Sequence, residues 1–94
     1  MQKSTHTGEY SALCRELRAL REAAHLTQRD LAAKLNVPHS WVAKVEAGER
    51  RIDIVELCWF AAACGAEPVA TFERLARQIP VSKWRRGAKG DRSK

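Results

Sequence analysis

Residues 27–51 read TQRDLAAKLNVPHSWVAKVEAGERR, and this stretch contains two helical patterns separated by only a few residues. Apolar residues recur in both halves at the three- and four-residue steps of one helical face. Between the halves, NVP is typical of a helix end followed by a new start, because Asn tolerates a left-handed backbone and Pro presets a helical φ angle. Helices this short are marginal alone, so each must pack on the other or on a further partner.

Side chains mark the limits of the two helices. Thr27 followed by Asp30 resembles a capping box, in which the hydroxyl accepts from a free amide and the carboxylate favours the positive helix start. We therefore expect one helix from Thr27 to Asn36 and a second over about 38–47, with Gly48 as its stop signal. The residues predicted to face inward are Leu31, Ala32, Leu35, Val42 and Val45.

Two further helices are predicted on either side of this pair. Apolar residues from Tyr10 to Ala24 recur at helical spacing, which predicts a first helix over about 9–25. Asp53 and Glu56 form a second capping box, and the apolar run after them predicts a helix that Gly65 ends. This helix is apolar around most of its circumference, which is typical of a central helix or one shared with a second subunit.

A fifth helix completes the prediction. Pro68 opens it and Pro80 ends it, and between them lies an apolar stripe. No alternating strand pattern and no internal repeat is present in the sequence, so we predict an all-α fold of five short helices. The stripe comprises Val69, Phe72, Leu75, Ala76 and Ile79.

Length and charge suggest one domain and an anionic partner. Ninety-four residues, 45% hydrophobic and 30% charged, fit a single core. We assign residues 1–8 to a flexible N-terminus, 9–80 to the domain and 81–94 to a basic tail, which holds six Lys/Arg against one Asp of a chain with net charge +6. Nucleic acid is favoured over a membrane, because no amphipathic lipid-facing helix accompanies the charge. The tail is either a solvated end or, around Trp84, an arm that enters a DNA groove.

Several function classes have little support in the sequence. No apolar run approaches the roughly 18 residues of a membrane span and no secretory block is present, so we expect a cytoplasmic protein. The three cysteines form no CxxC pair and have no histidine at ligand spacing, so no metal is expected. Histidines without paired carboxylates and the lack of a glycine-rich phosphate loop argue against an enzyme or a cofactor.

Two short helices joined by about three residues fit the helix-turn-helix unit. From about Leu17 to Ile79 the chain resembles the Cro and phage-repressor type, the XRE family, through LTQRDLAAKL, NVPHSW, VAKVEAGERR and IDIVEL. Asn36 stands where that family often has glycine, but Asn adopts the same backbone. The resemblance implies a bacterial or phage-encoded, nucleoid-associated repressor that binds a palindromic operator as a homodimer.

The second helix of the unit carries the predicted readers of DNA. The resemblance places it in the major groove, where each base pair displays a distinct pattern of donors and acceptors. His39 and Lys44 match positions that touch base edges, and Lys44 favours guanine acceptors. Ser40 suits a base or a phosphate, while Trp41 either lies against the DNA backbone or packs over the turn.

Other residues are predicted to hold the phosphates or the scaffold. Gln28 and Arg29 correspond to family positions that contact the DNA backbone at a helix start, and Arg50 and Arg51 are expected to be further phosphate clamps. The family also pairs a Glu late in the reading helix with an Arg of the first helix. Here these residues are Glu46 and Arg21, and we expect a semi-buried structural ion pair.

The remaining apolar residues suggest contacts with partners other than DNA. Trp59 and Phe60 are adjacent and cannot both enter one small core, so one of them meets the fifth helix or a second subunit. Dimer contacts are expected from the fifth helix and the exposed edge of the fourth. Two alternatives stay open: an antitoxin that represses its own operon and masks a toxin, and a protein-interaction module that kept the fold without binding DNA.

Overall fold

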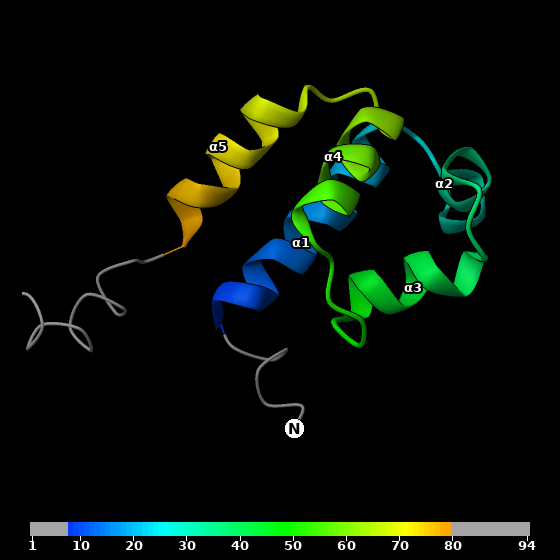
Figure 1. Ribbon diagram of the computed structural model, residues 1–94, viewed down its shortest axis with the longest axis horizontal. Helices are drawn as coiled ribbons and strands as arrows, with labels where there is room; N and C mark the ends of the chain where they lie inside the picture. Colours follow the sequence, from blue (N-terminus) through cyan, green and yellow to red (C-terminus); the bar gives the residue numbers. More distant parts are fainter. Residues whose placement is uncertain (1–7, 80–94) are drawn as a thin grey trace, which may run out of the picture.

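The computed structural model describes residues 8–79, and these residues form five α-helices (Figure 1). No strand occurs within this range, which confirms the all-α prediction. Gly8, expected in the flexible N-terminus, is the first residue of α1, while the rest of that segment and the basic tail lie outside the described residues. The helices are α1 (Gly8–Ala23), α2 (Gln28–Leu35), α3 (His39–Ala47), α4 (Ile54–Ala63) and α5 (Pro68–Gln78).

The helix ends follow the predicted capping signals. At the start of α2, the Asp30 amide donates to the Thr27 hydroxyl at 3.0 Å, and the Thr27 amide donates to the Asp30 carboxylate at 2.9 Å. Asn36 and Gly48 end α2 and α3 with left-handed φ angles of 59° and 80°. His25, just after α1, also adopts a left-handed backbone, with φ 60°, and no sequence signal indicated it.

The core lies where α1 and α4, side by side in the middle of the molecule, meet the other helices (Figure 1). α2 packs on α3 and α4, and α3 packs on α1, so the short pair has the partners that its length requires. Ala32 is buried on α2, at the side that faces this core. The largest of the fully buried side chains, all but one of them apolar, are Leu17, Leu31, Val42, Val45, Phe60 and Thr71.

The neighbouring aromatic residues of α4 lie on different faces of the helix. Phe60 is completely buried, whereas the Trp59 side chain is 59% exposed. A helix turns by about 100° per residue, so adjacent residues occupy different faces. This arrangement confirms that the two rings do not share the core.

The apolar stripe of α5 is only partly inside the molecule. Leu75 is buried, but Val69, Ile79 and Phe72 are exposed, the last of them at 52%. The inward face instead includes Thr71, whose hydroxyl donates to the Glu67 carbonyl at 3.0 Å. In this orientation a polar side chain of α5 also contacts α1 at the surface: the Arg74 guanidinium donates to Glu16 at 2.6 Å.

Candidate nucleic-acid interface

The start of α3 presents polar side chains outward. His39, Ser40 and Lys44 are exposed, while Val42 and Val45 on the opposite side of the same helix are completely buried. The burial of the two valines fixes the rotation of α3, because a turn of the helix would expose them and bury Lys44. The predicted readers therefore share one face of a helix that cannot easily rotate.

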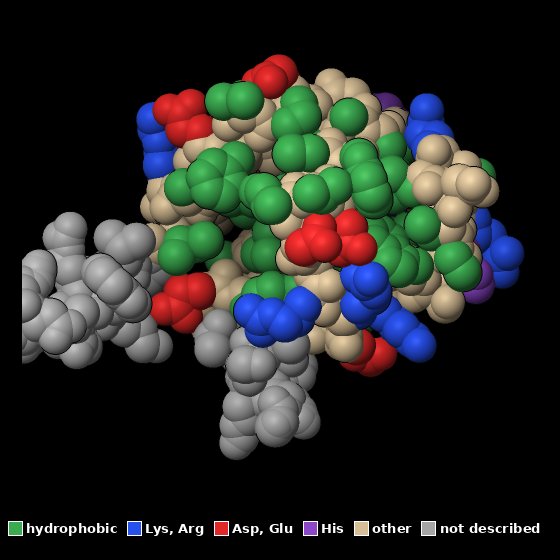
Figure 2. All heavy atoms as spheres, viewed as in Figure 1, with side chains coloured by type: hydrophobic (Ala, Val, Ile, Leu, Met, Phe, Trp, Pro, Cys, Tyr) green, Lys and Arg blue, Asp and Glu red, His purple; other side chains and the backbone are tan. Residues whose placement is uncertain are grey.

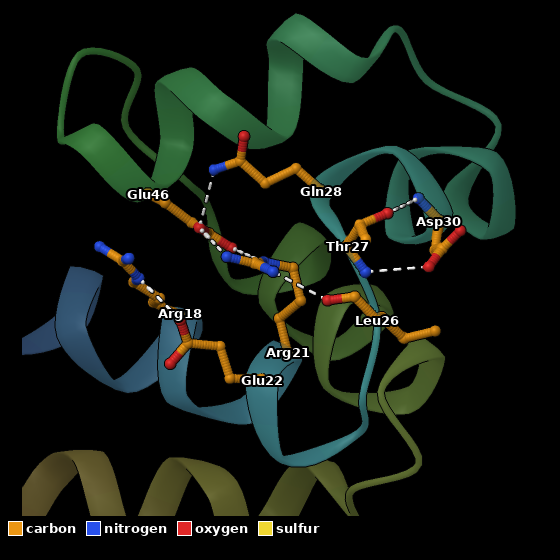
Figure 3. A network of polar contacts seen from close by, with 8 residues as sticks. All are labelled: Arg18, Arg21, Glu22, Leu26, Thr27, Gln28, Asp30 and Glu46. Carbon is orange, nitrogen blue, oxygen red and sulfur yellow. Dashed lines mark hydrogen bonds and ion pairs between the residues drawn. The ribbon is translucent and has the colours of Figure 1, made fainter.

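A polar network ties the end of α3 to α1 (Figure 3). The Arg21 guanidinium donates to both carboxylate oxygens of Glu46, at 2.7 and 3.0 Å, and to the Leu26 carbonyl at 2.8 Å. The two side chains are 10% and 4% exposed, so the predicted semi-buried pair is present and more deeply buried than expected. The hydrogen bonds that Arg21 donates to Glu46 raise the pKa of Arg21, against the opposite effect of burial.

The same network includes Gln28 at the start of α2. Its side-chain amide donates to Glu46 at 3.0 Å, so the group that was predicted to hold a phosphate makes an internal bond here (Figure 3). Arg29, the next residue, is exposed. An open depression of about 520 Å³ lies between the starts of α2 and α3 and is lined in part by Gln28, Arg29 and His39. The structure thus places predicted phosphate and base contacts around one hollow.

Arg50, which lies beyond the end of α3, contacts Trp41 in the first turn of that helix. The Arg50 guanidinium lies 5.1 Å from the centroid of the Trp41 ring and donates to both oxygens of Glu56 at 3.2 Å. Trp41 is partly buried against the core, which favours the packing alternative for this ring. Glu56 was identified from the sequence only as a helix cap, and its contact with Arg50 had no sequence signal.

The Arg51 guanidinium lies over the aromatic ring of Tyr10 in α1. Its guanidinium is 4.5 Å from the centroid of Tyr10, and the Tyr10 hydroxyl accepts a hydrogen bond from the Ile52 amide at 3.0 Å. Burial, the largest effect, raises the pKa of Tyr10, while the hydrogen bond from the Ile52 amide acts in the opposite direction. Both predicted clamps are thereby held by aromatic residues close to the start of α4.

Residues 8–79 contain neither a cluster of metal-binding side chains nor a single long apolar helix. No group of three or more His, Cys, Asp or Glu side chains within this range could hold a metal ion. No single helix there is long and apolar enough to cross a membrane. One pair, Ile54–Ala63 with Pro68–Gln78, passes the same test of length and composition together, but the two helices are bent by 118°.

Comparisons with known proteins agree with this geometry. Residues 12–75 match a helix-turn-helix domain family. A solved structure, that of an XRE-family like protein from Pseudomonas syringae pv. tomato str. DC3000, is similar with a TM-score of 0.74 and 40% sequence identity, over 83% of this chain and 95% of that one. A search of curated protein sequences found no match. The chain therefore belongs to the XRE-type helix-turn-helix family of DNA-binding regulators.

Proposed function

We propose that the protein is a sequence-specific repressor that binds a palindromic operator as a homodimer. The observation that carries this proposal is the exposed polar face of α3, which is held in place from behind by buried valines and at its end by the Arg21–Glu46 pair. A rigid helix with polar side chains near its start suits the major groove, which admits one helix. Occupation of a promoter by the dimer would exclude polymerase.

The proposed contacts fall into two groups. His39, Ser40 and Lys44 read base edges, with the Lys44 ammonium directed to guanine acceptors. Arg29 and Arg51 contact phosphates, together with the backbone amides of Gln28 and Arg29, because the first amides of a helix have no acceptor within it. The depression that Arg29 and His39 line supports this division, since it brings a backbone contact next to a base contact.

The proposed dimer surface consists of the outward faces of α4 and α5. Figure 2 shows hydrophobic side chains gathered over these two helices on one face of the molecule. A continuous apolar surface of this kind is uncommon on a monomer and typical of an interface. In a dimer with two-fold symmetry, this apolar surface would be buried against the same surface of a second copy, without a different protein as partner. The exposed residues are Ile54, Val55, Cys58, Trp59 and Ala62 of α4 and Val69, Phe72 and Ala76 of α5.

Dimerisation would also increase the affinity and the selectivity of DNA binding. One recognition helix covers few base pairs, and each mismatch costs only about 1–3 kcal/mol, so a single copy discriminates poorly among genomic sites. Two copies related by a two-fold axis read two half-sites, spaced about 34 Å apart on one side of the duplex. The operator is therefore expected to be a pseudo-palindrome.

The experiment that tests this function is selection of bound duplexes from a random pool by the full chain, followed by gel shifts at two salt concentrations. The proposal expects recovered sequences with inverted half-sites, and repression of a reporter when the recovered site overlaps its promoter. Binding without any sequence preference, or no binding at low salt, would overturn it and favour a protein-interaction module.

A further inference from the structure

The turn between α3 and α4 holds an arginine whose donors are directed into the protein. Two guanidinium nitrogens of Arg50 donate to the two carboxylate oxygens of Glu56, and one of them also donates to the Arg51 carbonyl at 2.9 Å. Paired bonds between a planar guanidinium and a carboxylate fix both distance and orientation. The Glu56 side chain is 17% exposed and that of Arg50 is 41% exposed, so the carboxylate is the better shielded of the two partners.

The oriented guanidinium covers the Trp41 ring. At 5.1 Å from the ring centroid, the Arg50 cation is within range of an attractive cation–π contact. The core packs against the same tryptophan, so its ring is held between the core and Arg50. Trp41 lies in the first turn of α3, directly after His39 and Ser40, whereas Glu56 belongs to α4. The three side chains thus connect the start of the proposed reading helix with the start of α4.

Charge argues against a phosphate contact by the same arginine. The hydrogen bonds from Arg50 are the largest of the effects that hold the pKa of Glu56 below its ordinary value, so the carboxylate is ionised at neutral pH. An arginine in two bonds with a carboxylate adds little net positive charge to a surface. Phosphate contacts strengthen binding by releasing counterions, which requires a cation that is not already neutralised. Arg29 is exposed and meets that requirement better.

We propose that Arg50 is a positioning residue: Glu56 orients its guanidinium over Trp41, and this contact holds the first turn of α3 at the angle that base reading requires. The inference rests on the proposed DNA-binding function. It has an unusual consequence, because Glu56 is an anion near the proposed DNA surface and yet is required for tight, selective binding. Repulsion between the Glu56 carboxylate and the DNA phosphates alone would predict that removal of this anion strengthens binding.

Glu56→Gln is the deciding variant. Glutamine can keep the capping box with the Asp53 amide, but it loses the charge that orients Arg50. We expect affinity for the selected operator to fall by about tenfold, which corresponds to about 1.4 kcal/mol, while binding to unrelated duplex stays equal or becomes tighter. Glu49→Gln is the matched control, since Glu49 is an exposed anion of the same turn, and this variant should bind the operator at least as tightly as the wild type.

Arg50→Lys separates positioning from charge. Lysine keeps the positive charge but has no planar fork, so a positioning role predicts loss of operator affinity comparable to that of Arg50→Ala, with an unchanged salt dependence. A phosphate contact predicts instead that Arg50→Lys binds like the wild type and that Arg50→Ala flattens the salt dependence. As a readout without DNA, the indole N–H resonance of Trp41 should shift in Glu56→Gln and not in Glu49→Gln.

The outcomes of the two proposals are distinguishable. If the wild-type protein selects no sequence, the proposed function fails. If it selects an operator but Glu56→Gln binds that operator as tightly as or more tightly than the wild type, only the positioning role of Arg50 is overturned. All variants are compared at a temperature at which circular dichroism shows them to be fully folded.

Discussion

At the scale of single residues, the Arg21–Glu46 pair has the clearest structural role. A buried ion pair is not stabilising by default, because removing two charges from water is costly. Here the cost is offset by further hydrogen bonds: Arg21 also reaches the Leu26 carbonyl, and Glu46 also accepts from Gln28. The pair joins the end of α3 to α1 and to the start of α2 (Figure 3), so it constrains three elements of the proposed interface.

Removal of one member of this pair should destabilise the fold strongly. Arg21→Met leaves the Glu46 carboxylate buried without its cation, and we expect the free energy of unfolding to fall by about 3 kcal/mol or more. Urea unfolding measures this change. The double variant Arg21→Met/Glu46→Met should recover part of the loss. As a control, Arg18→Met removes the exposed Arg18–Glu22 pair and should cost well under about 1 kcal/mol.

Base and phosphate contacts should respond differently to truncation. Lys44→Ala removes a proposed base contact and should change the preferred base at one position of each half-site, with a loss of about 1–3 kcal/mol for the selected operator. Arg29→Ala should weaken binding to every duplex and reduce the dependence of affinity on salt. Gel shifts with operator variants at several salt concentrations test both. A Lys44→Ala protein with unchanged base preference would argue against its reading role.

At the scale of elements, the two short helices of the motif depend on a close crossing. Ala32 is buried on α2 next to α3, and the two helices pack on each other more extensively than other pairs do. A small residue allows the helix axes to approach, and the apolar residues around it anchor both helices to α1 and α4. The geometry of the motif therefore depends on the small size of the Ala32 side chain as much as on the larger apolar side chains around it.

Enlargement of Ala32 should show this dependence. Ala32→Leu overpacks the crossing and is expected to cost about 1–3 kcal/mol of unfolding free energy, with a larger loss of operator affinity as α3 is displaced. Ala33→Leu is the matched control, because Ala33 is the exposed neighbour on the same helix. Thermal unfolding of the two variants makes the comparison. Equal stability of both would show that the crossing tolerates bulk.

The capped helix starts make stability depend on pH. Hydrogen bonds from Thr27, the backbone amide first, lower the pKa of Asp30 from 3.8, and Arg50 and the Asp53 amide lower the pKa of Glu56 from 4.5. A carboxylate whose pKa is depressed by folding stabilises the protein above its unfolded pKa, and this stabilisation is lost as the pH falls through the folded pKa. Urea unfolding should thus show constant stability above about pH 5 and a decline below it. Glu56→Gln should lessen the decline.

At the scale of the whole molecule, α3 presents a polar surface, whereas α4 and α5 present an apolar one. The exposed polar residues of α3 and the exposed apolar residues of α4 and α5 lie on different helices, so the proposed DNA contact and the proposed dimer contact do not exclude each other. The outward face of α4 continues the apolar character that its sequence shows all round, with Trp59 as its largest exposed side chain. Phe72 of α5 is exposed as well and adds to that face, whereas Thr71 and Leu75 occupy the inward side of the helix.

A charge in this apolar surface should separate the subunits. Trp59→Lys is expected to shift the protein to a monomer in sedimentation equilibrium and to reduce operator affinity by at least about tenfold. Monomer stability should hardly change, since the ring is largely exposed. Ala19→Lys places the same charge at an exposed position of α1 and should stay dimeric. Alkylation of the exposed Cys58 gives a second measure: it should slow as the wild-type protein concentration rises.

The sequence by itself determined the elements and the motif. Capping boxes, Asn36 and Gly48 are local signals, because a cap needs only neighbouring backbone amides, and helical spacing selects which residues are buried. What only the tertiary structure decided are contacts between side chains of different elements: Arg74 of α5 with Glu16 of α1, and Arg50 with Glu56 of α4 and Trp41 of α3. Such contacts depend on how the helices are rotated against each other, which no local pattern encodes.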